Sequence, residues 1–154
     1  MKLTKHFNLE EFTRSQLAIR HGILNEPSPE QIENLRQLCI HVLEPIRIRF
    51  GPVLISSGFR CPELNVLMSK ARDSHHQYGY AADFEVDGFS NLIIAEYVRD
   101  NLSFSRCVLE FYTPGVPNSG WVHVSYISHQ LEELVFTMYR KDGSVITESG
   151  FITV

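Results

Sequence analysis

Three residues of this chain have the side chains and the spacing of a transition-metal site. His76 and Asp83 are separated by six residues, and His123 follows in the apolar stretch Trp121-Val122-His123-Val124-Ser125. Two imidazole nitrogens and one carboxylate can hold a tetrahedral zinc ion and leave one position open for water. The set therefore predicts a catalytic Zn²⁺ site, although any one histidine taken alone is more often a surface or hydrogen-bonded core side chain.

The elements around these residues are expected to bring them together. Residues 81–86 and 121–127 have the composition of strands, and side chains alternate between the two faces of a strand. If the two strands are neighbours, opposed Cβ atoms lie about 4.5–5.5 Å apart, so Asp83 and His123 could coordinate the same ion. His76 would complete the site from the preceding loop, where Gly79 permits the turn that the backbone needs.

The rest of the chain predicts α+β architecture, with N-terminal helices packed on a mainly antiparallel sheet that carries the zinc site. Ser28, Pro29 and Gln31 have the pattern of a capped helix start, and Pro45 should kink or interrupt that helix. The elements expected from periodicity and turn residues are short helices within 8–22, a helix from 29 to about 46, a strand at 53–57, a helix at 62–69, a polar loop at 70–79, a helix at 90–101, a strand at 106–112, a loop at 113–120, and strands at 121–127, 133–139 and 145–147.

Length, composition and charge limit the classes of protein to consider. The 154 residues are 44% hydrophobic, which suits one domain spanning residues 1–154. The net charge is -4 with no basic cluster, and no segment is apolar enough for a membrane span. We therefore expect a monomer without a nucleic-acid or membrane partner.

The cysteines and the first residues indicate a compartment. Cys39, Cys61 and Cys107 lack the paired spacing of a metal or redox motif, so we expect free, buried thiols and a reducing environment. The start Met1-Lys2-Leu3-Thr4-Lys5 lacks the apolar run of a signal peptide. Synthesis in the cytoplasm without a signal peptide is the resulting expectation.

Three ordered motifs resemble one known family. They are Ser56-Ser57-Gly58-Phe59-Arg60-x-Pro62-x-Leu64-Asn65, Ser74-x-His76-x-x-Gly79-x-Ala81-x-Asp83, and Trp121-Val-His123-Val-Ser125. Together they are similar to the M15 zinc peptidases, the group of D-Ala-D-Ala carboxypeptidases and phage endolysin peptidases. The resemblance extends over about residues 3–140 and includes the segment Leu43-Glu44-Pro45.

The resemblance implies roles for individual residues. His76, Asp83 and His123 match the metal ligands of the family. Arg60 matches an arginine that polarises the scissile carbonyl or holds a substrate carboxylate. Ser74 would support His76 or contact substrate, and a loop or capping serine is the alternative.

Aromatic residues near the motifs could line the cleft. Tyr80 and Trp121 are the candidates for substrate contact, together with Tyr78, although each is more often a packing residue.

The general base is the least direct assignment. Several branches of the family have a carboxylate three residues before the last histidine, where this chain has Gly120. The expected substitute is Glu110, a charged residue inside an apolar strand, where burial is costly without a partner. Glu85 and Asp87 are fallback candidates. A second departure is the segment 66–73, which lacks the glycine-rich character often seen in the family.

The resemblance implies a zinc-dependent peptidase that hydrolyses amide bonds in the stem peptides of peptidoglycan, of the D-Ala-D-Ala or the L-Ala-D-Glu type. The expected setting is a phage or prophage cell-wall lysis enzyme that reaches the wall after release, or a virion-associated one. The alternative is a non-catalytic, zinc-binding phage structural or wall-binding module.

Overall fold

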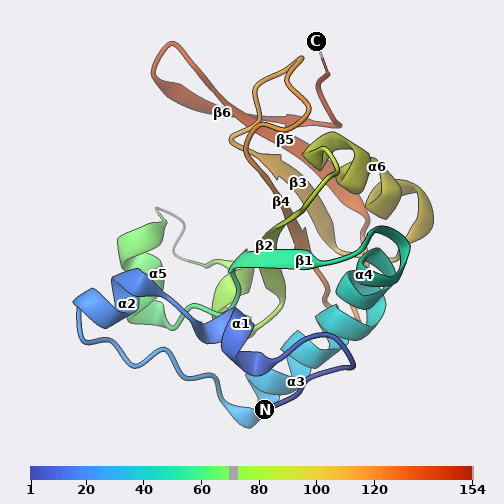
Figure 1. The fold of residues 1–154 in the computed structure, drawn as a ribbon. Coiled ribbons are helices and arrows are strands. Elements are labelled where there is room, and N and C mark those ends of the chain that lie inside the picture. Colours follow the sequence, from blue (N-terminus) through green and yellow to red (C-terminus); the bar gives the residue numbers. More distant parts are fainter. Residues whose placement is uncertain (70–72, 154) are drawn as a thin grey trace.

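The computed structural model describes residues 1–69 and 73–153, which form helices around one six-stranded sheet (Figure 1). The helical elements are α1 (Leu9–Thr13), α2 (Gln16–Arg20), α3 (Pro29–Leu38), the π-helical turn η1 (Cys39–Leu43), α4 (Glu44–Phe50), α5 (Pro62–Met68), the 3₁₀ turn η2 (His75–Tyr78) and α6 (Asn91–Asn101). The strands are β1 (Val53–Ser57), β2 (Ala81–Val86), β3 (Arg106–Glu110), β4 (Trp121–Ser125), β5 (Leu134–Lys141) and β6 (Ser144–Ser149). The α+β fold class is confirmed.

The sheet has the order β1-β2-β4-β3-β5-β6. All neighbouring pairs are antiparallel except β3 and β5, which are parallel, so the prediction of a mainly antiparallel sheet is confirmed. The chain leaves β3 for the adjacent β4 and returns to the other side of β3 with β5. The two central strands of the site, β2 and β4, are neighbours in the sheet although they are about 40 residues apart in the chain. In this pair, Asp83 is directly opposed to His123.

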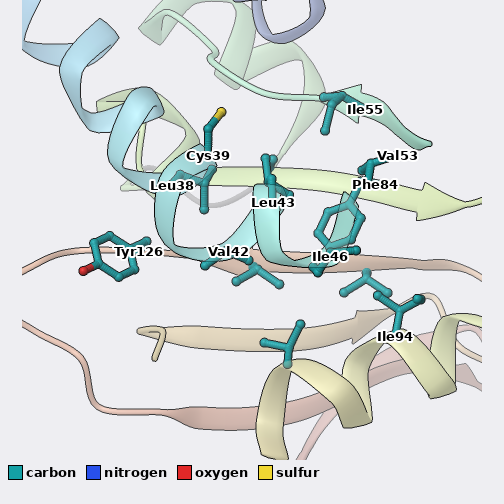
Figure 2. Packing of buried hydrophobic residues seen from close by; sticks show 14 of the residues in the cluster. Leu38, Cys39, Val42, Leu43, Ile46, Val53, Ile55, Phe84, Ile94 and Tyr126 are labelled. Atoms are coloured by element: carbon teal, nitrogen blue, oxygen red, sulfur yellow. The ribbon is translucent and has the colours of Figure 1, made fainter. Parts of the chain in front are cut away.

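One face of the sheet carries the hydrophobic core. Alternate residues of β2, β4 and β3 point to this face, where α3, η1, α4 and α6 cover them. Figure 2 shows Leu43 and Ile46 of the helical segment close to Phe84 of β2, with Ile94 of α6 below them. Because side chains alternate, the intervening residues of the same strands face the opposite side. The strands thus present an apolar face to the helices and a polar face to the site.

The long helical segment at 29–50 is interrupted just before Pro45, as predicted, but it continues past the predicted end at about residue 46. Ser28 and Gln31 form the predicted capping box at its start. Proline lacks the N–H that an α-helix needs and collides with the preceding turn. The backbone accommodates it by widening into η1 immediately upstream, where the N–H of Glu44 donates to the carbonyl of Cys39, and the helix then continues as α4. Pro45 therefore reshapes the helix without ending it.

Several predicted boundaries are wrong by a few residues. The strand predicted at 106–112 ends at Glu110, because Phe111 adopts a left-handed φ of 51° that a strand cannot continue. The strand predicted at 121–127 ends at Ser125, and the last two strands are longer than predicted. The predicted loop at 70–79 contains the turn η2, while residues 70–72 lie outside the described residues. Cys39 and Cys107 are buried as expected, but Cys61 is partly exposed.

Among the described residues, no helix has both the length and the apolar character needed to cross a membrane.

Candidate active site

The three predicted metal ligands meet on the polar face of the sheet. His76, Asp83 and His123 are buried, and one ligand atom of each lies within 4.8 Å of the others. Oδ1 of Asp83 is 2.9 Å from Nδ1 of His123 and 3.4 Å from Nε2 of His76. In a tetrahedral zinc site with bonds of about 2.0–2.2 Å, ligand atoms are separated by about 3.3–3.5 Å. The donor types fit zinc, and the 3.4 Å spacing falls within this range, whereas the 2.9 Å between Asp83 and His123 is a hydrogen-bond distance.

The sheet register explains how two of these residues meet. Asp83 and His123 are directly opposed across the antiparallel pair β2 and β4. Opposed residues point to the same face, so the predicted juxtaposition is present.

A short 3₁₀ turn supplies the third residue. Ser74 caps the turn η2, and its Oγ accepts a hydrogen bond from the backbone N–H of His76 at 3.3 Å. Gly79 ends the turn in the left-handed conformation with φ 77°, and a Cβ at this position would come within 2.4 Å of the carbonyl oxygen of Gln31. Ser74 therefore supports His76 by capping its turn, which combines two of its predicted roles. Substrate contact by Ser74 stays a prediction.

A backbone carbonyl selects the tautomer of His76. Nδ1 of His76 lies 2.7 Å from the carbonyl oxygen of Gly58, and since a carbonyl only accepts, Nδ1 carries the proton. Nε2 is left with its lone pair facing Asp83, as a metal ligand requires. The predictions did not include this role for Gly58. Glycine is needed there, because an added Cβ would lie 2.7 Å from Phe12.

Arg60 lies behind the three metal-ligand candidates, which we call the metal group, and it contacts one of them, Asp83. Its side chain is 10% exposed, and Nη2 donates to Oδ2 of Asp83 at 3.2 Å. Nε donates to Oγ of Ser57 at 3.0 Å, and Nη1 lies 3.5 Å from Oδ1 of Asn65. These contacts hold the Asp83 carboxylate with Oδ1 turned toward the histidines. The substrate roles predicted for Arg60 stay predictions.

The charges around the site determine which groups are ionised. Burial alone would raise the pKa of Asp83, but the neighbouring His76 and His123 more than offset it and hold the pKa well below its usual range. Burial alone would lower the pKa of His123, whereas the carboxylates of Glu110 and Asp83 raise it overall. Asp83 is thus the fixed anion of the site.

Glu110 reaches the edge of the metal group from β3. Its Oε2 lies 3.9 Å from Nδ1 of His123, and its Oε1 accepts a hydrogen bond from Nε1 of Trp121 at 2.9 Å. Trp121 is the residue directly opposed to Glu110 in the β3–β4 pair, and its ring packs against that of Phe111. The predicted base is therefore near the ligands, with one carboxylate oxygen held and the other directed to His123.

The backbone at Gly120 explains why the predicted general base, Glu110, is on β3 and not at the position three residues before His123. Gly120 has φ 62°, and a Cβ at this position would lie 1.9 Å from the carbonyl oxygen of Glu110. No side chain fits there, so this chain cannot have a carboxylate three residues before His123. Asn91, which is almost fully buried, donates from Nδ2 to the carbonyl of Gly120 at 3.0 Å and was not among the predicted residues.

The fallback bases are placed less favourably. Glu85 is exposed at the far end of β2, where Oε1 accepts from Nδ2 of Asn91 at 3.2 Å. Asp87 is exposed beyond the end of that strand.

The aromatic candidates are divided between two sides of the metal group. Tyr80 is partly buried beside η2, with its ring 5.9 Å from that of Tyr78 and 6.4 Å from that of His75. Trp121 lies with Glu110 on the other side.

The comparison with protein families agrees with this geometry. The family model described as Peptidase M15 matches residues 5–125, most of the chain. The chain belongs to the M15 peptidase family. No curated protein matches it.

Membership of the M15 family supports a metallopeptidase, and the peptidases of this family depend on zinc. The match ends at Ser125, the last residue of β4, and so includes all three metal-ligand candidates as well as Arg60 and Glu110. The strands β5 and β6 lie beyond it.

Proposed function

We propose that this M15 peptidase hydrolyses an amide bond in the stem peptides of peptidoglycan, of the D-Ala-D-Ala or the L-Ala-D-Glu type. We further propose that it acts as a monomer in phage or prophage lysis of the cell wall. The observation that carries the catalytic proposal is the place of Glu110, whose Oε2 lies beside the metal group. A non-catalytic zinc site has no need of a carboxylate at this point.

Each residue of the site has a definite part in this reaction. His76, Asp83 and His123 would hold the zinc ion, which acts as a Lewis acid and lowers the pKa of water toward neutrality when bound. Glu110 accepts a proton from the attacking water at Oε2 and passes it to the departing amine. The indole N–H of Trp121 holds Oε1, so the carboxylate cannot turn away from the ligands.

Purified muropeptides test the activity directly. The zinc-loaded protein should cleave them, a chelator should abolish cleavage and added zinc should restore it, with mass spectrometry identifying the bond. Tight zinc binding without cleavage would contradict the proposal and support a non-catalytic phage structural or wall-binding module.

Substitution of the base tests the mechanism. Glu110→Gln should keep its zinc and lower kcat/KM by about 10²- to 10⁴-fold, the usual contribution of a general base. Glu85→Gln is the matched control, because Glu85 lies on the same face, two residues from Asp83, with its carboxylate bonded to Asn91, and it should keep full activity. A Glu110→Gln variant with full activity would show that Glu110 is not the base.

A further inference from the structure

The polar face of the sheet is divided into successive rows of directly opposed residues. The central row contains Asp83, His123 and Val108. On one side of it Trp121 is opposed to Glu110, the predicted base. The row on the other side, which we call the Arg106 row, contains Ala81, Ser125 and Arg106.

Arg106 is an exposed cation next to the metal group. It is two residues from Val108 along β3, a distance of about 7 Å, which an arginine side chain can span. The side chain of Arg106 makes no hydrogen bond or ion pair with any residue of 1–69 or 73–153, while its backbone N–H donates to Oγ of Ser125. Ser125, the residue opposed to Arg106, is two residues from the ligand candidate His123 on the same face of the sheet. The row that carries the exposed Arg106 therefore adjoins the row of the ligands.

Arg60 cannot easily serve as a second carboxylate-binding group. It is almost fully buried, and its guanidinium already contacts Asp83, Ser57 and Asn65. An incoming carboxylate would have to displace the contact with Asp83, which leaves a buried anion without its partner. Arg106 needs no such displacement.

The two proposed substrate types share one chemical feature. In a D-Ala-D-Ala terminus, the residue that leaves as the amine carries a free α-carboxylate. In an L-Ala-D-Glu link, the D-Glu is joined onward through its side chain, so its α-carboxylate is also free. In both, the carboxylate is bonded to the carbon next to the scissile nitrogen. A single cation beside the metal group could recognise either substrate.

We propose that Arg106 binds the free α-carboxylate of the substrate residue that leaves as the amine. The proposal rests on the proposed peptidase function and names the group that orients its substrate. The planar guanidinium can form two parallel hydrogen bonds with a carboxylate, which fixes direction as well as position. The scissile nitrogen then stays within reach of Glu110, and the carboxylate of the leaving residue points toward the exposed Arg106 at the edge of this face.

Four synthetic peptides test this role, one pair with a D-Ala-D-Ala terminus and one pair with an L-Ala-D-Glu link. Each pair consists of the free α-acid and the α-carboxamide. For the bond that is cut, the native protein should prefer the acid by about 10- to 100-fold in kcat/KM, as expected for a hydrogen bond between charged groups. Arg106→Gln should lower kcat/KM for the acid to that of the amide and leave the amide unchanged. Arg106→Lys should keep part of the preference.

The controls separate a binding role from a structural one. Arg20→Gln removes another exposed arginine, at the end of α2, and should leave the acid-to-amide ratio as in the native protein. Zinc content and Tm should be the same in all variants, since a change in fold would lower both activities together. A ratio unchanged in Arg106→Gln and in Arg106→Lys would overturn the role of Arg106 and leave the peptidase function intact. Failure of the native protein to cut any of the peptides or muropeptides would overturn both proposals.

Discussion

Asp83 has a different partner for each of its carboxylate oxygens. Oδ1 faces the two histidines, and Oδ2 accepts from the guanidinium of Arg60. A buried carboxylate is stable only when its charge is compensated, and here the compensation also sets the direction of the free lone pairs. The ligand geometry is therefore built by residues behind the metal group as well as by the ligands themselves.

Gly120 offers a test at the scale of one residue. Gly120→Ala should destabilise the fold by about 2–4 kcal/mol, because the new Cβ would collide with the carbonyl of Glu110 in addition to straining a left-handed backbone. Gly22→Ala is the matched control, since Gly22 has φ 64° with nothing within 4 Å, and should cost only about 1 kcal/mol. Urea unfolding of both variants measures the difference, and equal losses would show that the close approach is unimportant.

At the scale of elements, the start of α4 holds the N-terminal segment. Glu44 accepts hydrogen bonds from Oγ1 of Thr4 at 2.7 Å and from the backbone N–H of His6 at 2.8 Å, and it lies 2.7 Å from Nδ1 of His6. Burial alone would raise the pKa of Glu44, but these contacts lower it overall. The charged form of Glu44 is thus favoured by folding, and the N-terminal segment is tied to the helix that covers the core.

The lowered pKa of Glu44 predicts how stability changes with pH. Its contribution is present above the unfolded-state pKa of about 4.3 and is lost as the pH falls through the lower folded-state pKa. Glu44→Gln should therefore cost about 1–2 kcal/mol at pH 7, and the difference from the native protein should shrink toward pH 3. Urea unfolding between pH 7 and pH 3, with chelator present, measures this. The exposed Glu33→Gln should have little effect, and a difference for Glu44→Gln that stays constant with pH would contradict the assignment.

At the scale of the whole molecule, the sheet separates stability from chemistry. One face packs under α3, α4 and α6, while the other carries the metal group, Glu110 and Arg106. The ligands come from η2, β2 and β4, so one ion would join three elements. Metal binding to such a site contributes directly to the stability of the fold.

Zinc should therefore raise the melting temperature. At a free zinc concentration of 100 times the Kd, binding adds about 2.7 kcal/mol, which corresponds to a rise of roughly 5–10 °C for a chain of this size. Thermal unfolding with zinc and with chelator measures the shift. His76→Gln should abolish it, and a native Tm that does not respond to zinc would show that the three residues do not form a tight site.

The sequence by itself was sufficient to predict the α+β class and the three metal-ligand candidates. Both depend on local patterns, since strand alternation assigns Asp83 and His123 to faces and the motif around Ser74 marks the turn that carries His76. Only the tertiary structure decided the surroundings of Glu110, Arg60 and Arg106. Their surroundings depend on the pairing of β3 with β4 and β5, and on the packing of the chain around Gly58. Contacts between segments far apart in the chain set these surroundings, and no local pattern records them.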